Sequence, residues 1–249
     1  MSKNIHAIIQ ARMTSSRLPG KVLLEGFKKP ILEHQIERLR WSKHITDVIV
    51  ATTTNATDDP VIELCDKLNV KYFRGSEENV LQRVLDTMRH HNTDIIVEIT
   101  GDCPLIDYQV VDEVIEYYLN NQYDYVSNVM ERTYPRGLDT QVFSKDVLEK
   151  VNSLTSHPMD REHVSIYIYK HPQTFSCSGI KLPANLAHPE YRWTLDTQDD
   201  YKFIKTVFEQ LYPTNPKFSY KDIYQLIQKM PELLEINKAI QQKPTNYYE

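Results

Sequence analysis

Short apolar runs alternate with amphipathic segments through the first half of the chain, and this alternation constrains the fold more than any other feature. Between the apolar runs, apolar residues recur at helical spacing, so one face of each helix can cover a sheet. This alternation is typical of βαβ units and predicts an α/β fold, a three-layer sandwich with a mostly parallel central sheet. The expected strands are Ile5–Gln10, Asp47–Thr52, Val70–Phe73, Asp94–Thr100 and Tyr123–Ser127.

The helical spacing occurs in three sets, which run from Ile31 to Leu39, from Val80 to Met88 and from Val110 to Leu119. A further helix is expected to run to Leu68. Asp58 and Asp59 are cap residues placed before Pro60, and a proline suits the first turn of a helix.

The regular pattern weakens after about residue 128. Thr140–Phe143 could form a short strand, and prolines interrupt the residues that follow. We therefore expect one domain over residues 1–249, with an insertion at about 129–190 that serves as a substrate or dimerisation lobe. The elements expected beyond it are a strand at Tyr191–Leu195, a helix from Phe203 to Leu211 and a helical tail to Ile240.

Charge and cysteine content limit the classes of partner. The 249 residues carry a formal net charge of -5, so the whole-protein field does not attract nucleic acid. Cys65, Cys103 and Cys177 are odd in number and widely separated, which indicates reduced thiols. Neither a signal-peptide pattern nor an apolar stretch of about 18 residues is present in the sequence. We expect a cytoplasmic protein that binds neither nucleic acid nor a membrane.

The loop expected after the first strand is rich in cations and hydroxyl groups. Cations can spread positive charge along a polyphosphate, hydroxyl groups can donate to its oxygens, and open α/β sheets bind ligands at the carboxyl ends of strands. The loop predicts a site for a nucleoside triphosphate, and the alternative is a solvated basic turn. It lacks the glycine spacing of a Walker A loop or a dinucleotide fingerprint. The residues in question are Arg12, Thr14, Ser15, Ser16, Arg17 and Lys21.

Two aspartates follow apolar runs that are expected to be strands. Asp102 comes after Gly101, which permits close backbone approach, and Asp107 is better placed than Asp102 to cap the next helix. Asp196 follows the later run, and the capping box of Thr197 and Asp200 leaves Asp196 without a structural role. If the two strands are neighbours, both carboxylates face the triphosphate and can hold Mg²⁺.

These motifs resemble those of the cytidylyltransferases that activate acidic sugars, a group that includes the CMP-KDO synthetases and the SpsF spore-coat polysaccharide branch. Gln10 stands where CMP-KDO synthetases commonly have proline and looks like the SpsF branch. The resemblance is carried by Ala11-Arg12, Ser16-Arg17-Leu18-Pro19, Lys21, Gly101-Asp102-Cys103-Pro104-Leu105 and Leu195-Asp196-Thr197.

The resemblance implies a GT-A-like nucleotidyltransferase fold, Mg²⁺ held by Asp102 and Asp196, and a homodimer. The catalytic set it implies is Arg12, Lys21, Asp102 and Asp196, and the nucleotide-binding set is Ala11, Arg12, Thr14, Ser15, Ser16, Arg17, Lys21 and Asp102.

Two further stretches look like the SpsF branch, Pro135-Arg136-Gly137-Leu138-Asp139 and Arg161-Glu162-His163-Val164. We expect Arg136, Asp139 and His163 to bind the sugar. The alternatives are an ion pair between Arg136 and Asp139 across a turn, and an exposed helix face or dimer contact over residues 161–163.

The expected function is transfer of CMP from CTP to an acidic, ulosonic-type sugar, with release of pyrophosphate, for surface polysaccharide or glycan synthesis. One alternative is a sugar-1-phosphate nucleotidyltransferase, although the loops of that class are usually richer in glycine. Another is a GT-A-type glycosyltransferase, although the sequence has no Asp-x-Asp tripeptide. The third is a non-catalytic nucleotide-sugar-binding protein.

Overall fold

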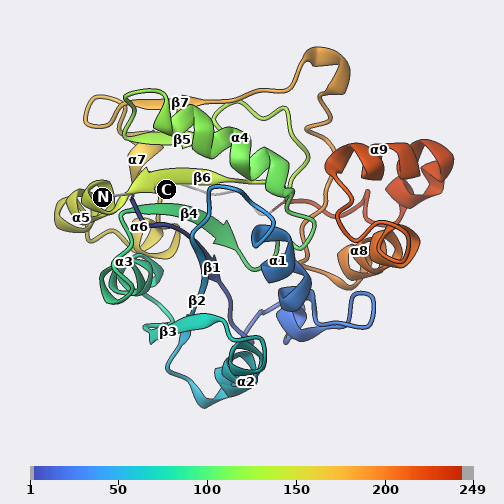
Figure 1. Cartoon of the computed structure of the whole chain (residues 1–249), viewed down its shortest axis with the longest axis horizontal. Coiled ribbons are helices and arrows are strands. Elements are labelled where there is room, and N and C mark those ends of the chain that lie inside the picture. Colours follow the sequence, from blue (N-terminus) through green and yellow to red (C-terminus); the bar gives the residue numbers. More distant parts are fainter. Residues whose placement is uncertain (1–2, 243–249) are drawn as a thin grey trace.

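The computed structural model describes residues 3–242, which build a seven-stranded sheet in the order β3-β2-β1-β4-β6-β5-β7, with helices on both faces (Figure 1). Strands β1 to β4 are parallel, and β6 is antiparallel to both β4 and β5. The mostly parallel sheet predicted from the sequence is therefore confirmed. The strands are β1 (Ile5–Gln10), β2 (Asp47–Thr53), β3 (Lys71–Gly75), β4 (Ile95–Thr100), β5 (Tyr125–Ser127), β6 (Gln141–Ser144) and β7 (Cys177–Gly179).

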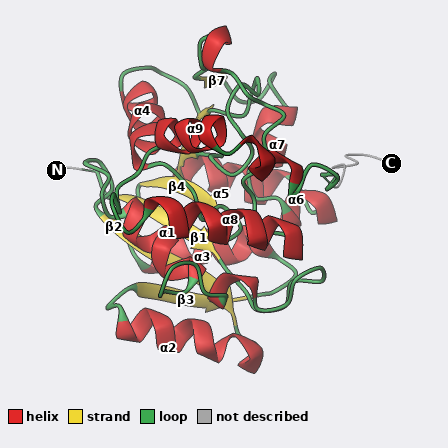
Figure 2. Ribbon diagram, turned by 90° about the vertical axis from the view of Figure 1, so that its right-hand side faces the viewer, coloured by secondary structure: helices red, strands yellow, loops and turns green. Residues whose placement is uncertain are grey.

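Two layers of helices cover the sheet, as Figure 2 shows from the side. Apolar residues of α1, α2 and α4 pack on one face, and those of α3, α5 and α7 pack on the other. Successive residues of β1 serve opposite layers, because Ala7 and Ile9 join the first cluster and Ile8 joins the second. The helices are α1 (Ile31–Leu39), α2 (Asp59–Lys67), α3 (Val80–His90), α4 (Tyr108–Leu119), α5 (Lys145–Leu154), α6 (Pro158–Glu162), α7 (Ile166–Lys170), α8 (Gln198–Leu211) and α9 (Tyr220–Lys229).

A third apolar cluster joins the C-terminal part of the chain to the sheet. Helices α8 and α9 pack around Trp193 and Leu195, and Ile31 of α1 belongs to the same cluster (Figure 1). The expected helical tail consists of α9 and a 3-10 turn at Pro231–Glu235.

Tyr191–Leu195 is not a strand, and the prediction was wrong at this point. The edge of β4 that faces away from β1 is already paired with β6, so no place in the sheet is open next to β4. The segment instead forms an isolated bridge with Arg136, which donates to Tyr191 O (3.0 Å) and accepts from Trp193 N (2.7 Å), and a hydrogen bond from Leu195 N to Asp102 O (2.8 Å). The last of these bonds still brings Asp196 close to Asp102.

Two of the three expected helix caps are confirmed. Asp107 caps α4 by accepting from the backbone of Gln109 at 2.8 Å, and Thr197 forms a capping box with Asp200 at the start of α8. Asp58 precedes α2 but makes no cap bond, because its carboxylate accepts from Met13 N at 2.7 Å instead.

Residues 129–190 contribute β6, β7 and helices α5 to α7 to the layers already described. That they serve as a substrate or dimerisation lobe of a single domain stays a prediction, as does the homodimer. Of the domain expected over 1–249, residues 1–2 and 243–249 lie outside the described part. Within residues 3–242, no helix is long and apolar enough to cross a membrane.

Gly137 is the position where a side chain would disturb this fold most directly. Its φ is +105°, and a Cβ there would lie 2.6 Å from the carbonyl carbon and oxygen of Trp193. We expect Gly137→Ala to lower the free energy of unfolding by about 2 kcal/mol or more, because backbone strain and overlap with backbone atoms combine. Urea unfolding measures the loss.

Gly20→Ala is the matched control. Gly20 also has a positive φ, of 71°, but the atom that a Cβ would meet is the flexible methyl of Met13 at 3.3 Å. A smaller loss, about 1 kcal/mol, is expected. Equal losses in the two variants would contradict the role of the close approach at Gly137.

Candidate active site

A cleft of about 530 Å³ opens at the carboxyl ends of β1 and β4 and collects side chains from separate parts of the chain. Among the residues that line it are, from the loop after β1, Arg12, Ser15, Ser16, Arg17 and Lys21. Further lining comes from Asp102 after β4, from Asp196 before α8, and from Glu162 and His163 at the end of α6. The structure thus brings the predicted basic loop and both predicted acids together.

Lys21 lies between the two aspartates. Its Nζ is 2.8 Å from Asp196 Oδ1 and 3.7 Å from Asp102 Oδ2. Lys21 lies at the start of a 3-10 turn, Lys21–Leu23, that follows Gly20 in the left-handed conformation. One ammonium group therefore bridges the carboxylates that come from two distant parts of the sequence.

Asp196 is surrounded by cations. Besides Lys21, Arg17 and Arg192 contact its Oδ2 at 3.0 and 2.8 Å, and the side chain is 9% exposed. Arg192 also binds Asp200, the partner in the α8 capping box, at 2.8 Å. Burial alone would raise the pKa of Asp196, but the charge and hydrogen bond of Lys21, with Arg17 and Arg192, lower it below its ordinary value. Asp196 is therefore ionised at neutral pH.

Asp102 is held by the turn that ends β4. Its Oδ1 accepts from the hydroxyl of Thr100 at 2.5 Å. A Cβ on Gly101 would lie 2.8 Å from the carbonyl oxygen of Gln10, so the close backbone approach predicted for this glycine is present. Burial raises the pKa of the neighbouring Cys103 well above its ordinary value, which keeps it a thiol and fits a structural role.

The basic loop is held by two carboxylates, Asp58 and Glu77, whose contacts with the loop were not predicted from the sequence. Buried Asp58 accepts from Met13 N and, at 3.2 Å, from Thr53 N at the end of β2. Glu77, which follows β3, accepts from Arg12 at 2.8 Å and from the hydroxyl of Thr14. Of the loop residues predicted to bind nucleotide, Thr14 therefore faces Glu77.

Ala11 lies beneath the cleft and is 2% exposed. It does not line the cleft with its neighbours, and any contact it makes with a ligand would come from its backbone.

The motif at residues 135–139 lies outside the cleft lining. Asp139 binds Arg132 through both of its oxygens, at 2.8 and 2.9 Å, so the alternative of an ion pair between Arg136 and Asp139 is wrong. The backbone of Arg136 accepts from Trp193, which places this motif behind the segment that carries Asp196. Sugar binding by Arg136 and Asp139 stays a prediction.

Within the motif at residues 161–163, the first residue has a structural role and the other two line the cleft. Arg161 donates to the backbone oxygen of Asn152 at 3.0 Å and to the backbone oxygen of Thr155, which anchors the end of α5. Glu162 and His163 line the cleft together with the basic loop. Of the three residues expected to bind the sugar, only His163 lines the cleft.

Sequence reasoning missed Arg192 and Arg83, which are both buried at the site. Arg192 bridges Asp196 and Asp200, and Arg83 of α3 lines the cleft. Arg83 left a signal, since it is a charged residue among the buried residues of an amphipathic helix. A charged side chain at a buried position needs an oppositely charged or hydrogen-bonding partner, and the sequence alone does not show which group that is.

A buried carboxyl group supports the floor of the cleft. Glu98 of β4 is 4% exposed, and its Oε1 accepts from the side chain of Gln10 at 2.8 Å, while Oε2 is buried without a hydrogen bond. Burial raises the pKa of Glu98 to about 7. Glu98 therefore binds its proton more tightly in the folded than in the unfolded chain.

The two central acids suit a divalent cation. Their oxygens converge on the ammonium of Lys21, which marks a position where positive charge is stabilised. Among the described residues, no group of three or more His, Cys, Asp or Glu side chains could hold a metal. Two carboxylates completed by phosphate oxygens and water are the donor set typical of Mg²⁺, so the residues present fit a nucleotide-bound metal.

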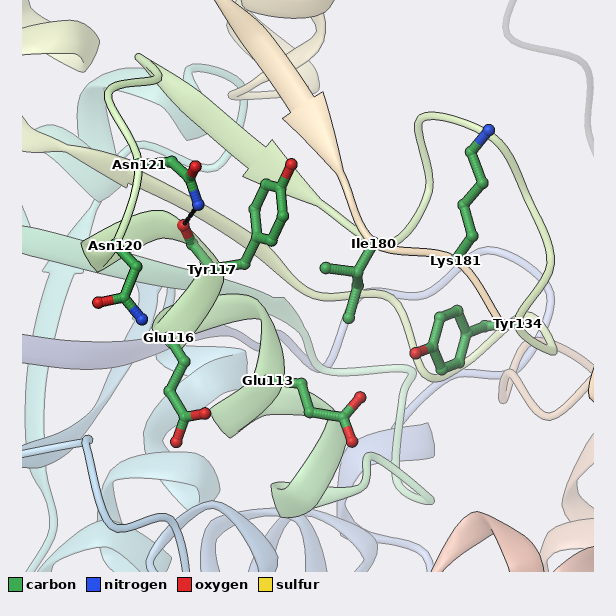
Figure 3. A pocket seen from close by; sticks show the side chains of 8 residues that line it. All are labelled: Glu113, Glu116, Tyr117, Asn120, Asn121, Tyr134, Ile180 and Lys181. Carbon is green, nitrogen blue, oxygen red and sulfur yellow. Dashed lines mark hydrogen bonds between the residues drawn. The ribbon is translucent and has the colours of Figure 1, made fainter. Parts of the chain in front are cut away.

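A second hollow beside α4 lacks this combination of groups (Figure 3). Glu113 and Glu116 of α4 line it, and Lys181 points away from both carboxylates. Glu116 is already paired with Lys43 at 2.6 Å and His44 at 2.9 Å. The cleft at the ends of β1 and β4 is therefore the candidate active site.

The comparisons with known proteins agree with this geometry. The profile of the cytidylyltransferase family matches residues 6–240. The spore coat polysaccharide biosynthesis protein SpsF of Bacillus subtilis is 31% identical, over 90% of this chain and 94% of its own. The 3-deoxy-manno-octulosonate cytidylyltransferase of Geobacter metallireducens is 26% identical, over 91% and 97%. A cytidylyltransferase from Leptospira borgpetersenii superposes with a TM-score of 0.89 at 36% identity, over 97% of this chain and all of its own.

Titration of Glu98 should make stability depend on pH. A folded pKa near 7, against an ordinary value of 4.5, means that wild-type stability falls between about pH 4.5 and 7 as the buried group loses its proton. Glu98→Gln removes this titration. The free energy of unfolding of the variant, minus that of wild type, should therefore increase by about 3 kcal/mol from pH 4 to pH 8.

Urea unfolding at a series of pH values measures this difference. Glu63→Gln, on the exposed part of α2, is the control and should follow the wild type. A difference between Glu98→Gln and wild type that does not change with pH would rule out the proposed titration.

Proposed function

The chain belongs to the cytidylyltransferase family, and we propose that it transfers CMP from CTP to an acidic, ulosonic-type sugar with release of pyrophosphate. The observation that carries the proposal is the convergence of Asp102 and Asp196 on Lys21 inside a cleft lined by further cations. Family membership makes the protein a nucleotidyltransferase, which removes the glycosyltransferase and non-catalytic alternatives.

Arg12, Arg17 and Lys21 bind the triphosphate in this proposal. All three line the cleft with Ser15 and Ser16, whose hydroxyl groups can donate to phosphate oxygens. Fixed cations stabilise the charge that develops on the departing pyrophosphate, and they need no reorganisation at the moment of reaction. When bound, Mg²⁺ held by Asp102 and Asp196 would neutralise the α-phosphate.

The acceptor enters from the side of Glu162 and His163. A hydroxyl oxygen of the sugar forms a bond to the α-phosphorus and releases its proton to water, and the bond from that phosphorus to the bridging oxygen of the β-phosphate breaks, which frees pyrophosphate. His163 is placed to orient the sugar, with Arg136 and Asp139 as more distant candidates. An acidic sugar is supported by the Geobacter relative, which is named for 3-deoxy-manno-octulosonate.

The pathway and setting follow from the same relatives. SpsF is named for spore-coat polysaccharide biosynthesis, so we infer a role in surface polysaccharide or glycan synthesis. All three cysteines are free thiols, which supports a cytoplasmic reaction.

Removing either central charge should stop the reaction. We expect Asp102→Asn and Lys21→Ala each to reduce pyrophosphate release by about 100-fold or more, because Asp102 would hold the Mg²⁺ and Lys21 stabilises the negative charge of the transition state. The assay contains CTP, Mg²⁺ and a panel of acidic sugars. Asp66→Asn, on the exposed face of α2, is the control. Unchanged release in both site variants would remove this assignment.

Nucleotide choice can be tested without knowing the sugar. A ligand that binds only the native state raises the melting temperature by mass action. We expect CTP with Mg²⁺ to raise it more than ATP, GTP or UTP does, and more than CTP with chelator. A larger shift with another triphosphate would instead assign that base to the site.

A further inference from the structure

Arg83 is a buried cation in the wall of the cleft. It lies in the first turn of α3 and is 3% exposed. Its Nη1 donates to the backbone oxygen of Ser76 at 2.5 Å and, less favourably, to that of Glu77 at 3.4 Å. Its Nε is buried and has no hydrogen-bond partner among the described residues.

The backbone makes room for this side chain. A Cβ on Gly75, at the end of β3, would lie 2.8 Å from Cγ of Arg83 and 3.1 Å from its Cβ. The absence of a side chain at Gly75 therefore lets the Arg83 stem lie against β3 and reach the cleft. Because the stem is fixed in this way, little side-chain entropy remains to be lost when the guanidinium binds a ligand.

The charge of Arg83 has no contacting counter-ion. It forms no ion pair in the described part of the chain, in which Glu77 pairs with Arg12, and Asp58 and Glu77 act on it only from a distance. Burial and the charge of Arg12 lower the pKa of Arg83 to about 10, against the opposing charges of Asp58 and Glu77, so it still carries its proton at neutral pH. A buried charge without a counter-ion is costly, and a site that retains one is suited to an anion from outside.

Burial alone does not identify a ligand site, as Arg38 shows. Arg38 is 1% exposed, has a similarly lowered pKa and, like Arg83, donates to two backbone oxygens, those of Ile106 and Phe218. It does not line the cleft. Arg83 does line the cleft, in the same wall as Arg12.

We propose that Arg83 is a nucleotide-binding residue whose guanidinium is the counter-ion of a phosphate group of the bound nucleotide. This inference rests on the proposed function and adds a residue to it. Lys21 and Arg17 already contact Asp196, whereas Arg83 lines the cleft without an ion pair to any acid of the described residues. A phosphate that binds it need not displace an acid, and Nε and the terminal nitrogens form a fork suited to two phosphate oxygens.

The test compares ligands that lose their phosphates one at a time. Binding of CTP, CDP, CMP and cytidine, each with Mg²⁺, is measured by calorimetry for wild type and for Arg83→Met, which keeps the length and loses the charge. We expect CTP binding to weaken about 10- to 100-fold, as for the loss of a charge-assisted hydrogen bond. Cytidine binding should change less than about threefold. The step at which the loss disappears identifies the phosphate.

Two further variants separate binding from folding. Arg83→Lys keeps the charge without the fork and should lose less CTP affinity than Arg83→Met. Arg89→Met, on the exposed side of the same helix, is the matched control and should bind like wild type. The melting temperature of each variant without nucleotide is measured as well, because Arg83→Met also removes the hydrogen bond to Ser76 O, and only variants that are folded at the temperature of the calorimetry are compared.

Equal weakening for cytidine and CTP would overturn the inference, because the contact would then be to the nucleoside or to the fold. Unchanged CTP affinity in Arg83→Met would overturn it as well. If wild type binds none of the four ligands, the proposed function fails together with this inference. Wild-type binding that Arg83→Met retains would remove the role of Arg83 alone.

Discussion

The geometry of the cleft depends on the ion pair between Lys21 and Asp196, 2.8 Å apart. Asp196 is only 6% exposed, and a buried carboxylate is costly unless cations and hydrogen bonds surround it. Arg17 joins Lys21 from the basic loop, and Arg192 joins from the segment before α8. These contacts balance the buried charge and also connect the first loop of the chain to its last third, so the stability and the shape of the site have the same origin.

Backbone contacts set the distance between the two acids. Gly101 N donates to Gln10 O at 2.9 Å, which draws the turn carrying Asp102 against the end of β1. Leu195 N donates to the carbonyl oxygen of Asp102 itself at 2.8 Å. Asp196 is thus presented beside Asp102 without being part of the sheet. The main chain thus places the two residues side by side, and the contacts of Thr100 and Lys21 orient their carboxylates.

Local signals explain which features the sequence predicts. β1 and β4 can be predicted because a buried strand is visible as a run of apolar residues. The caps Asp107 and Thr197 can be predicted because a cap and the residues that it binds lie within three positions of each other. Competition between distant segments leaves no local sequence signal. The sequence therefore does not show that β6, and not residues 191–195, pairs with β4. Asp58 was misread for the same reason, since the loop it holds lies far away in sequence. The acids themselves were found because each follows an apolar run.

Three buried arginines show how burial and position together indicate a role. Arg192 lies between Asp196 and Asp200, and its charge is neutralised within the fold. Arg38 is enclosed by backbone oxygens and the Phe218 ring. Arg83 shares their burial but lines the cleft, and no acid forms an ion pair with it in the described part of the chain. What distinguishes the proposed ligand-binding arginine from the two structural ones is therefore its position, because of the three only Arg83 lines the cleft.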